Sequence, residues 1–499
     1  MTRVDPRGPA AVVPPRARGR VLGSVAGAGV SGVLGLLLVV VVTHGLDVAD
    51  AGRVLTGVAV LTVVTAGCCL GVDTGLIWLL PRTPDAGSRR VAVRSGVRRA
   101  LFMAVLTAAL VAACAKPLAA LLFPGPHGFA LTLVTAVAVP ALVASTVLVA
   151  AVRGLDRLPA YLVLQFGALP AGRVLGAGLA VTAGGAAAST LAGWAAVAVV
   201  TALLAAVVVL RVTRGGTRPA VRSERAVARR LWAFCRPRAV SSLIDASAGW
   251  VGVLLVAALA GSAEAARFGT VSRCALAGLL VMQAVRVATA TQFSQLLRRG
   301  DTAEVGALYR ASTRWVVTVS WPVFGVVAAY ASTVLGVFGA QYRDAAGAMV
   351  VVAAAMLVNT GCGNAQSVLL MSGDSRRHLV ATTTGLLVTV TGAVAFVPSH
   401  GVLAAALAWA GGIVVENLLV VWWVRTRLHV GLLDRQTVAL LALLLLAVAP
   451  TVVVVRLAAG PGATSLLFAV VTAFSVLTLG LLAMPREPGR PAAGGPTWS

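Results

Sequence analysis

Three arginines interrupt long apolar stretches and are the side chains best suited to bind an anion. They are Arg173, Arg273 and Arg286. An arginine at the centre of a membrane-spanning helix costs at least about 2.5 kcal/mol, so such residues are rare without a function. A guanidinium stays protonated and pairs bidentately with phosphate oxygens. We therefore predict that these arginines bind a pyrophosphate group. Arg173 and Arg286 are the stronger candidates, because Arg273 lies nearer the end of its stretch and could extend to the surface.

Three acidic residues lie in comparable apolar stretches: Asp73, Asp245 and Glu416. Each can pair with an arginine or respond to a coupling ion, and an H+ or Na+ gradient is the only cofactor that we expect. Static charge neutralisation is the structural alternative, because a buried ion pair often only offsets the desolvation of its own charges. The sequence lacks the ligand spacing of a metal site, and we expect no bound metal.

Amide side chains complete the polar set within the apolar stretches: Gln165, Gln283, Asn359, Asn364, Gln366 and Asn417. In a hydrated cavity these amides would bond to sugar hydroxyls. The alternative is that they hold helices together, which is a common role of amides in membrane-spanning helices.

The elements that carry these residues are predicted to be membrane-spanning helices. Of the 499 residues, 59% are apolar, and most apolar runs have the length of about 20 residues that crosses a hydrocarbon core. We predict an all-α polytopic membrane protein with about fourteen spans. These fall at 20–43, 53–79, 97–121, 129–152, 159–184, 187–210, 239–260, 266–293, 314–338, 345–371, 379–397, 401–424, 437–458 and 463–484.

Charge distribution gives an independent orientation. Arginines concentrate in alternate connecting segments, the richest of which are 82–99 and 211–238. The positive-inside rule places these segments and both termini in the cytoplasm. The net charge of +25 therefore indicates orientation and contact with anionic membrane lipids rather than nucleic-acid binding. A further basic segment, 298–314, is predicted to be an amphipathic helix lying at the membrane interface.

An internal repeat divides the chain into two halves. Residues 49–56 recur about 214 residues later as residues 263–270, and 122–125 resemble 337–340. Because each copy holds an even number of spans, the repeats are parallel, which is a transporter architecture. We predict a basic N-terminal tail (1–19), a first six-helix lobe (20–210), a basic linker (211–238), a second lobe (239–424), two further helices (437–484) and a C-terminal tail (485–499). The repeat also places Asp73 and Arg286 at similar depth, and we predict that they pair in one conformational state.

Several segments resemble the polysaccharide and lipid-linked oligosaccharide flippases of the multidrug/oligosaccharidyl-lipid/polysaccharide exporter superfamily. The resemblance covers about the whole chain and rests on these residues: 46–53, 70–77, 292–315, Pro322, 337–342 and 369–374. It implies two six-helix lobes around a cavity that opens alternately to each side. It also implies a bacterial cytoplasmic membrane and an undecaprenyl-pyrophosphate-linked oligosaccharide, or a similar polyprenyl-linked glycan, as the cargo. Polysaccharide assembly proteins are expected partners.

Two other functions fit parts of the sequence. An ion-coupled multidrug exporter of the same superfamily is the alternative within the transporter class, although the two additional C-terminal helices favour a lipid-linked cargo. A membrane-embedded glycosyltransferase would use an acid in the first outer loop, where Asp47 and Asp50 lie. Glu264 matches Asp50 in the second repeat, which indicates a symmetric structural element instead. We therefore expect a transporter and no enzyme.

Overall fold

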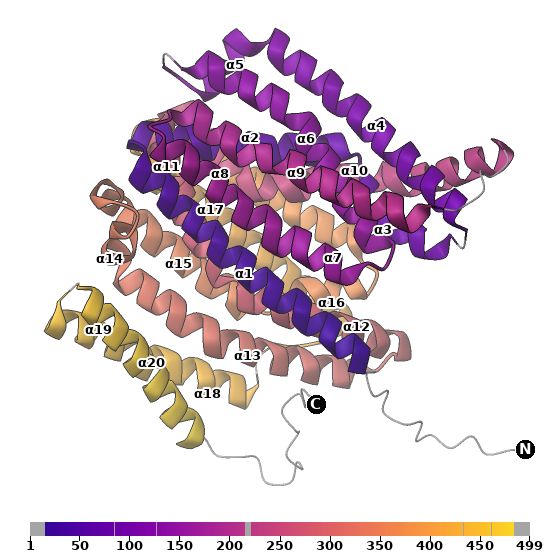
Figure 1. Cartoon of the computed structure of the whole chain (residues 1–499). Coiled ribbons are helices and arrows are strands. Elements are labelled where there is room, and N and C mark those ends of the chain that lie inside the picture. Colours follow the sequence, from indigo (N-terminus) through magenta and orange to yellow (C-terminus); the bar gives the residue numbers. More distant parts are fainter. Residues whose placement is uncertain are drawn as a thin grey trace, which may run out of the picture.

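The computed structural model describes residues 15–83, 85–125, 127–214, 221–432, 434–460 and 462–483. Within them every regular element is helical, as a bilayer requires of a chain that must satisfy its backbone hydrogen bonds internally. The first half contains α1 (Pro15–Gly45), α2 (Val48–Cys69), α3 (Val72–Leu79), η1 (Leu80–Arg82), α4 (Ala86–Ala113), α5 (Ala115–Leu122), α6 (Gly128–Gly154), α7 (Leu158–Leu162), η2 (Val163–Ala168), α8 (Leu169–Thr182) and α9 (Ala187–Thr213) (Figure 1).

The second half follows with longer and more interrupted helices. It contains α10 (Val221–Ala260), α11 (Ser262–Gly278), α12 (Leu280–Arg299), α13 (Thr302–Ala329), α14 (Ala331–Gly336), η3 (Ala340–Ala345), α15 (Ala346–Gly361), α16 (Ala365–Met371) and α17 (Ser375–Leu428). The last elements are α18 (Arg435–Leu443), η4 (Leu444–Val448), α19 (Ala449–Ala459) and α20 (Ala463–Ala483).

Many of these helices can span a membrane. Among the described residues, eight helices are long and apolar enough, and the number rises to ten when two bent helix pairs each count as one span. The shorter helices Gly29–Gly45 and Ala463–Leu479 are also apolar. α17 consists of two successive helices, because Gly401 has a φ of 54° and a ψ of −135°. The chain is therefore a multi-pass helical membrane protein, and the count of fourteen stays a prediction.

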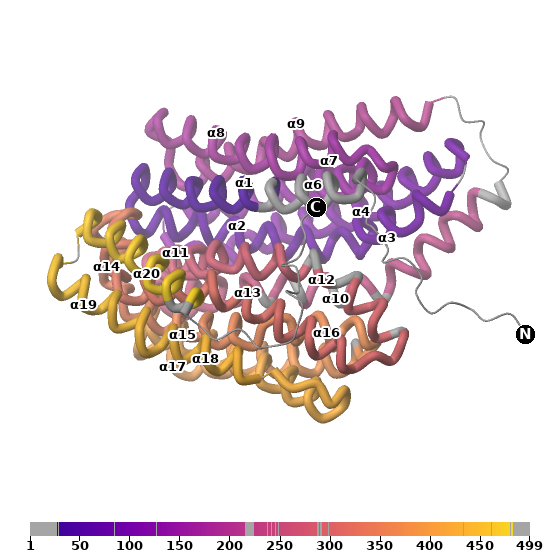
Figure 2. The backbone as a smooth tube through the Cα atoms, turned by 90° about the horizontal axis from the view of Figure 1, so that it is seen from below, coloured from indigo at the N-terminus to yellow at the C-terminus, as the bar shows by residue number. Residues whose placement is uncertain are grey.

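The buried side chains form separate clusters. One cluster is built almost wholly by α2–α9, and another joins α11, α13–α15 and α17 with a few residues of α1, α2 and α10. Figure 2 shows the helices of the first half on one side of the molecule and those of the second half on the other. A further cluster packs α18–α20 against α13 and α14. The functional side chains are thus held by two packed halves with an added C-terminal group.

The sequence repeat corresponds to a repeated set of contacts. In the first half Arg53 forms an ion pair with Asp50 and donates to the carbonyl oxygen of Pro124 at 2.8 Å. In the second half Arg267 forms an ion pair with Glu264 at 2.5 Å and donates to the carbonyl oxygen of Gln341 at 3.3 Å. The prediction that Asp50 belongs to a symmetric structural element is confirmed.

The two halves meet closely where α2 crosses α11. A Cβ atom at Gly52 would lie 1.7 Å from the carbonyl oxygen of Ser262. Only glycine permits this approach, since any side chain would push the two backbones apart. Gly52 therefore fixes the distance between the halves at this end of the molecule.

Two basic segments differ from their predicted conformation. Residues 221–238 of the predicted linker form the first turns of α10, while 215–220 lie outside the described part. Residues 302–314 are the start of α13 rather than a separate interfacial helix. Gly300, with a φ of 72°, ends α12, and the Asp301 carboxylate accepts a hydrogen bond from the Glu304 amide at 3.0 Å. This cap joins the two helices by a tight turn.

The predicted cytoplasmic tails fall mostly in 1–14 and 484–499, which also lie outside the described residues.

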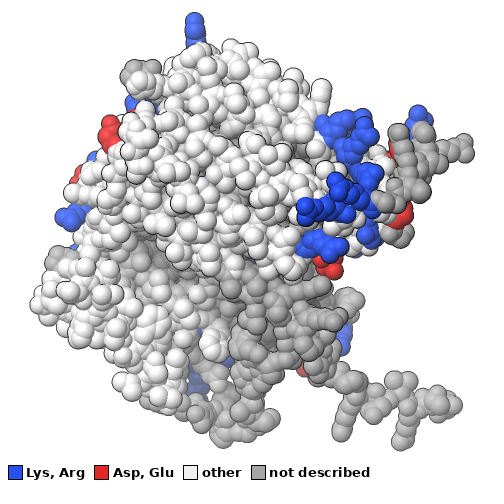
Figure 3. Space-filling view, in the orientation of Figure 1, with Lys and Arg blue, Asp and Glu red and all other residues white. Residues whose placement is uncertain are grey.

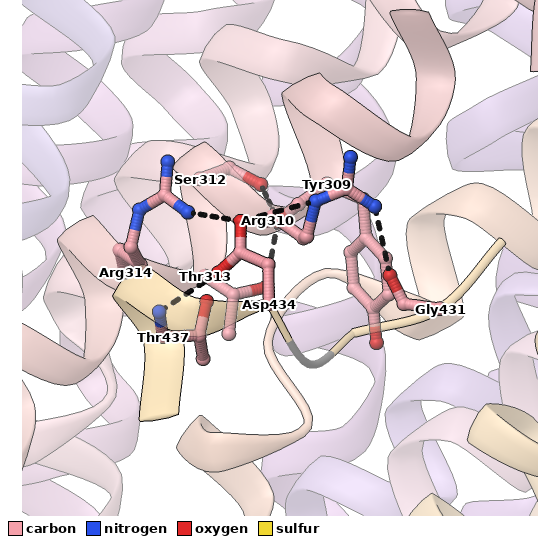
Figure 4. A network of polar contacts seen from close by, with 8 residues as sticks. All are labelled: Tyr309, Arg310, Ser312, Thr313, Arg314, Gly431, Asp434 and Thr437. Atoms are coloured by element: carbon pink, nitrogen blue, oxygen red, sulfur yellow. Dashed lines mark hydrogen bonds and ion pairs between the residues drawn. The ribbon is translucent and has the colours of Figure 1, made fainter. Parts of the chain in front are cut away.

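A polar network fastens the C-terminal helices to α13 (Figure 4). Asp434 accepts a hydrogen bond from the Thr437 amide at 2.8 Å and so caps α18. Its carboxylate also pairs with Arg314 at 2.9 Å and with Arg310 at 3.3 Å. Arg310 in addition donates to the carbonyl oxygen of Gly431 at 3.2 Å. The position of α18 is thereby tied to the start of α13.

Candidate functional site

A cavity of about 350 Å³ lies among α2, α3, α6, α8, α9 and α10. It combines charged, hydroxyl and apolar side chains. The lining residues are Leu61, Thr62, Thr65, Ala66, Cys69, Asp73, Leu142, Thr146, Arg173, Trp194, Arg238 and Ser242. Among the described residues, the lining holds two arginines and one aspartate, which together contribute a net positive charge to the cavity.

Arg173 is positioned by the close packing of α8 on α9. Its guanidinium carbon lies 4.1 Å from the ring centroid of Trp194, a cation–π contact that is strengthened by burial. A Cβ at Gly176 would lie 2.3 Å from the carbonyl oxygen of Gly193, so glycine brings the two helices together beside this contact. The π-helical segment η2 precedes α8, and such segments often accompany functional sites. The Nε atom of Arg173 is buried and makes no hydrogen bond with the described residues.

Asp73 enters the cavity because the second predicted span is broken. α2 ends at Cys69, and α3 begins at Val72 after Leu70 and Gly71, whose φ angles are 51° and 71°. A Cβ at Gly71 would lie 2.9 Å from the carbonyl oxygen of Cys235, so the break also packs against α10. The Oδ1 atom of Asp73 is buried without a hydrogen bond to the described residues. The break thus places a carboxylate in the first turn of a new helix, on the lining of the cavity that also contains Arg173.

Arg238 is the functional side chain that sequence reasoning missed. The sequence assigned it to the basic linker, but it lies within α10 and lines the cavity together with Ser242, one turn later. The available signal was its position directly before the apolar run 239–260. Because α10 continues from the basic segment into the apolar run, Arg238 lies within the helix and reaches the cavity.

Arg273 lies close to this site and is held by an aromatic ring of its own. Its guanidinium carbon is 3.8 Å from the ring centroid of Trp250. Arg173 and Arg273 are near enough for their like charges to interact. Among the described residues, however, the cavity lining includes Arg173 and not Arg273. Arg273 therefore adds to the positive potential near the cavity from α11.

Arg286 and Glu416 form a second charged cluster in the other half. The Glu416 carboxylate accepts hydrogen bonds from Gln366 and Thr382, both at 3.1 Å. Arg286 lies within electrostatic range of Glu416, and its Nε atom is buried without a hydrogen bond to described residues. In this conformation Arg286 is thus associated with Glu416, while Asp73 lines the cavity with Arg173. The pairing of Asp73 with Arg286 in another state stays a prediction.

The remaining predicted site residues have varied surroundings. Asn364 is fully buried and donates to the Thr289 hydroxyl at 3.2 Å, and Asn417 donates to the Ile413 carbonyl at 2.9 Å. Asn359 donates to the sulfur of Met356 at 3.8 Å. Gln165 is half-buried in η2, and Gln283 is exposed on α12. The Asp245 side chain lies outside the described part of the structure.

The site offers cationic and hydroxyl groups rather than a metal centre. In the described ranges there is no group of three or more His, Cys, Asp or Glu residues that could hold a metal ion. What the cavity presents is a pair of guanidinium groups, several hydroxyls and an aromatic ring. This combination suits a phosphate-bearing molecule with apolar and hydroxyl parts.

The fold is shared with solved structures of membrane transporters. A lipid II flippase in an inward closed conformation aligns with 92% of this chain and 98% of its own, with a TM-score of 0.71 and 9% identity. The alignment with an inward-facing multidrug resistance MATE family transporter covers 82% of this chain and 94% of that transporter, with a TM-score of 0.64 and 15% identity. The alignment with a MOP superfamily transporter from Pyrococcus furiosus covers 83% of this chain and 96% of that transporter, with a TM-score of 0.55 and 14% identity. These likenesses confirm the all-helical transporter fold.

Sequence comparison places the chain more narrowly. No curated protein matches it significantly. The model of a family described as polysaccharide biosynthesis protein matches residues 57–347, a range that contains the cavity residues from Leu61 to Ser242. This match covers more than half of the chain and confirms the resemblance that the sequence motifs indicated. The chain therefore belongs to the polysaccharide biosynthesis protein family.

Proposed function

We propose that this protein translocates an undecaprenyl-pyrophosphate-linked oligosaccharide, or a similar polyprenyl-linked glycan precursor, across a bacterial cytoplasmic membrane by alternating access. The observation that carries the proposal is the cavity in which Arg173 and Arg238 face the same space as Asp73 and Trp194. Family membership supports a role in polysaccharide biosynthesis. The lipid II flippase shares the fold over nearly its whole length.

The cavity suits each part of such a cargo. The two guanidinium groups offer planar donors for the pyrophosphate oxygens, and Thr62, Thr65 and Thr146 offer hydroxyls near them. The first sugar would lie against Trp194. The volume of about 350 Å³ holds a pyrophosphate and one adjoining sugar at most. The rest of the glycan and the lipid chain would need the wider opening of another state.

The coupling of transport to an ion gradient is part of the proposal. Asp73 and Glu416 are the acids whose environment would change as the halves move, since Asp73 faces the cavity and Glu416 is held by Gln366 and Thr382. Protonation of either carboxylate, or Na+ binding to it, would change its pairing with an arginine. A change in pairing biases alternating access only by its difference between the two states.

An ion-coupled multidrug exporter is the second candidate, because the MATE transporter shares the fold with a TM-score of 0.64. The charge of the cavity favours transport of a pyrophosphate-linked glycan over export of cationic drugs. Two arginines against one aspartate give a positive potential, which repels cationic compounds and attracts a pyrophosphate. We propose transport without bond chemistry, and polysaccharide assembly proteins as partners that supply or consume the glycan.

Reconstitution of the purified protein in liposomes tests the function. A polyprenyl-pyrophosphate-linked glycan and a cationic dye would be supplied separately, each with and without an H+ or Na+ gradient. We expect translocation of the glycan lipid, measured by its accessibility to a glycan-modifying enzyme, and no movement of the dye. Dye export without glycan movement would establish the multidrug exporter instead.

Orientation has its own test in Cys114, which is exposed between α4 and α5. The proposed topology puts this end of the molecule outside the cell. A membrane-impermeant maleimide should label intact cells that carry the native protein and should not label the Cys114→Ser variant. Labelling of Cys114 only after the membrane is opened would reverse the orientation.

A further inference from the structure

We propose that a pocket between α4 and α10, separate from the cavity, binds the phosphate of an anionic membrane phospholipid. The pocket has a volume of about 420 Å³, and four of its seven lining residues are arginines. Its lining consists of Arg99, Arg225, Ala228, Arg229, Trp232, Ala233 and Arg236. This site goes beyond the proposed transport function, because it uses none of the residues that line the cavity.

The arginines converge because of helix geometry. Arg225, Arg229, Trp232 and Arg236 follow one another at spacings of four, three and four residues on α10, which places them on one face. Arg99 comes from α4, which packs against α10. Its guanidinium carbon lies 4.9 Å from the ring centroid of Trp232. Trp232 thus holds Arg99 of α4 next to the three arginines of α10.

Charge balance calls for an anion in this pocket. The ion pairs between residues that the structure describes use other arginines, namely Arg53, Arg267, Arg310, Arg314 and Arg377. Four guanidinium groups around one space give a positive potential that attracts an anion. Figure 3 shows Lys and Arg side chains gathered at this end of the molecule, over the ends of α3, α4 and α10. A phosphate accepts the paired donors that arginines present.

The depth of the pocket identifies its occupant as a lipid rather than a soluble phosphate. Arg99 is the last charge before the apolar part of α4, and Phe102, three residues later, is exposed. On α10 the exposed Val240 follows four residues after Arg236. Exposed apolar side chains directly beside the arginines offer a surface for acyl chains, while the phosphate lies among the guanidinium groups.

Neighbouring aromatic rings support the same depth. Trp78 of α3 stacks on Phe234 of α10 with ring centroids 4.7 Å apart. Arg82 and Arg230 lie over the Trp78 ring at 5.1 Å and 5.4 Å. Tryptophan is enriched at the level of the lipid headgroups, and basic pockets between spanning helices on the cytoplasmic side bind anionic headgroups.

Native mass spectrometry of the full-length protein tests the site, with phosphatidylglycerol as the probe and phosphatidylcholine as the zwitterionic control. The pocket variant combines Arg229→Gln with Arg236→Gln. The matched control combines Arg94→Gln with Arg98→Gln, because these arginines are exposed on α4 and lie outside the pocket lining. Both variants lose the same net charge. We expect the pocket variant to bind phosphatidylglycerol about thirtyfold more weakly than the native protein, and the control variant to retain its affinity.

Three outcomes would overturn the proposal. Equal losses in the two variants would show that diffuse surface charge attracts the lipid. Displacement of phosphatidylglycerol by millimolar inorganic phosphate would show a site for the soluble ion. Unchanged binding in the pocket variant would exclude the pocket altogether. The Arg173→Gln variant separates this site from the transport cavity, since it should bind phosphatidylglycerol like the native protein even if the proposed function is wrong.

Discussion

Trp194 covers the guanidinium group of Arg173 at 4.1 Å inside the cavity, and Trp250 covers that of Arg273 at 3.8 Å outside its lining. The two contacts are alike in geometry but differ in access to the proposed cargo. The tryptophan beside the cavity therefore orients a binding group, whereas the other holds a neighbouring charge.

This difference gives a first prediction. Trp194→Leu should weaken binding of a polyprenyl pyrophosphate about tenfold, because Arg173 loses a cation–π contact that fixes its direction. Trp250→Leu should weaken it less, since Arg273 acts only through its charge. Calorimetric titration in detergent measures both affinities. Equal losses from the two substitutions would mean that the cavity lining does not distinguish Arg173 from Arg273.

A second prediction concerns the partners of Asp73. In this conformation Asp73 shares the cavity with Arg238, while Arg286 is associated with Glu416. Asp73→Asn should impair transport, and combining it with Arg238→Gln should show a coupling of about 1 kcal/mol. If partners exchange during the cycle, Asp73→Asn and Arg286→Gln should also combine less than additively in transport rate. Strictly additive effects of Asp73→Asn and Arg286→Gln on the transport rate in liposomes would rule out the exchange of partners.

A third prediction follows from the contact between the halves. Gly52→Ala should reduce stability by about 1–3 kcal/mol, because the added Cβ would meet backbone where no side chain can move aside. Gly35→Ala is the matched control, since its Cβ would have nothing within 4 Å. Thermal unfolding in detergent compares the two variants. A Gly52→Ala protein as stable as the native one would show that the halves are not held at this crossing.

The fourth prediction is a pH dependence at the start of α18. Partial burial alone would raise the pKa of the Asp434 carboxyl, but the hydrogen bond from the Thr437 amide and the charge of Arg314 outweigh it and lower that pKa below its usual value. A lowered pKa in the folded state means that the stabilisation is present above the unfolded pKa of about 3.9 and is lost as the pH falls below it.

Hydrogen exchange of α18 measures this effect. In the native protein, protection of the first turns of α18 should fall as the pH is lowered through 4, after correction for the intrinsic exchange rate. Asp434→Asn should show no such transition, because its amide still caps the helix but does not titrate. A transition of the same size in the variant would assign the pH dependence to another group.

The sequence predicted the features that depend on long patterns. Apolar runs of span length predicted an all-helical membrane fold. The recurrence of 49–56 as 263–270 predicted a symmetric structural element, in which the structure shows equivalent ion pairs of Arg53 and Arg267. The cost of charge in hydrocarbon drew attention to Arg173 and Asp73, and the structure places both on the lining of one cavity.

Features that depend on local backbone geometry were not predictable in the same way. The break at Leu70 and Gly71 gives no interruption in hydropathy, since both residues sit within an apolar run. Arg238 was assigned to a linker because charge density alone cannot tell a basic loop from the first turns of a helix. The grouping of Arg286 with Glu416 depends on the tertiary packing of α12 on α16 and of α16 on α17, which residue spacing does not contain.

The central claim is that a positively charged cavity in the first half moves a pyrophosphate-linked glycan. Its most direct test is glycan-lipid translocation in liposomes by Arg173→Gln and by Arg157→Gln, an exposed arginine outside the cavity. Each variant removes one positive charge, and each is first shown to be folded by its thermal transition. Arg173→Gln should lower the translocation rate at least about tenfold, the loss expected for one charge-assisted contact, while Arg157→Gln keeps the native rate. Native translocation by Arg173→Gln would contradict the account.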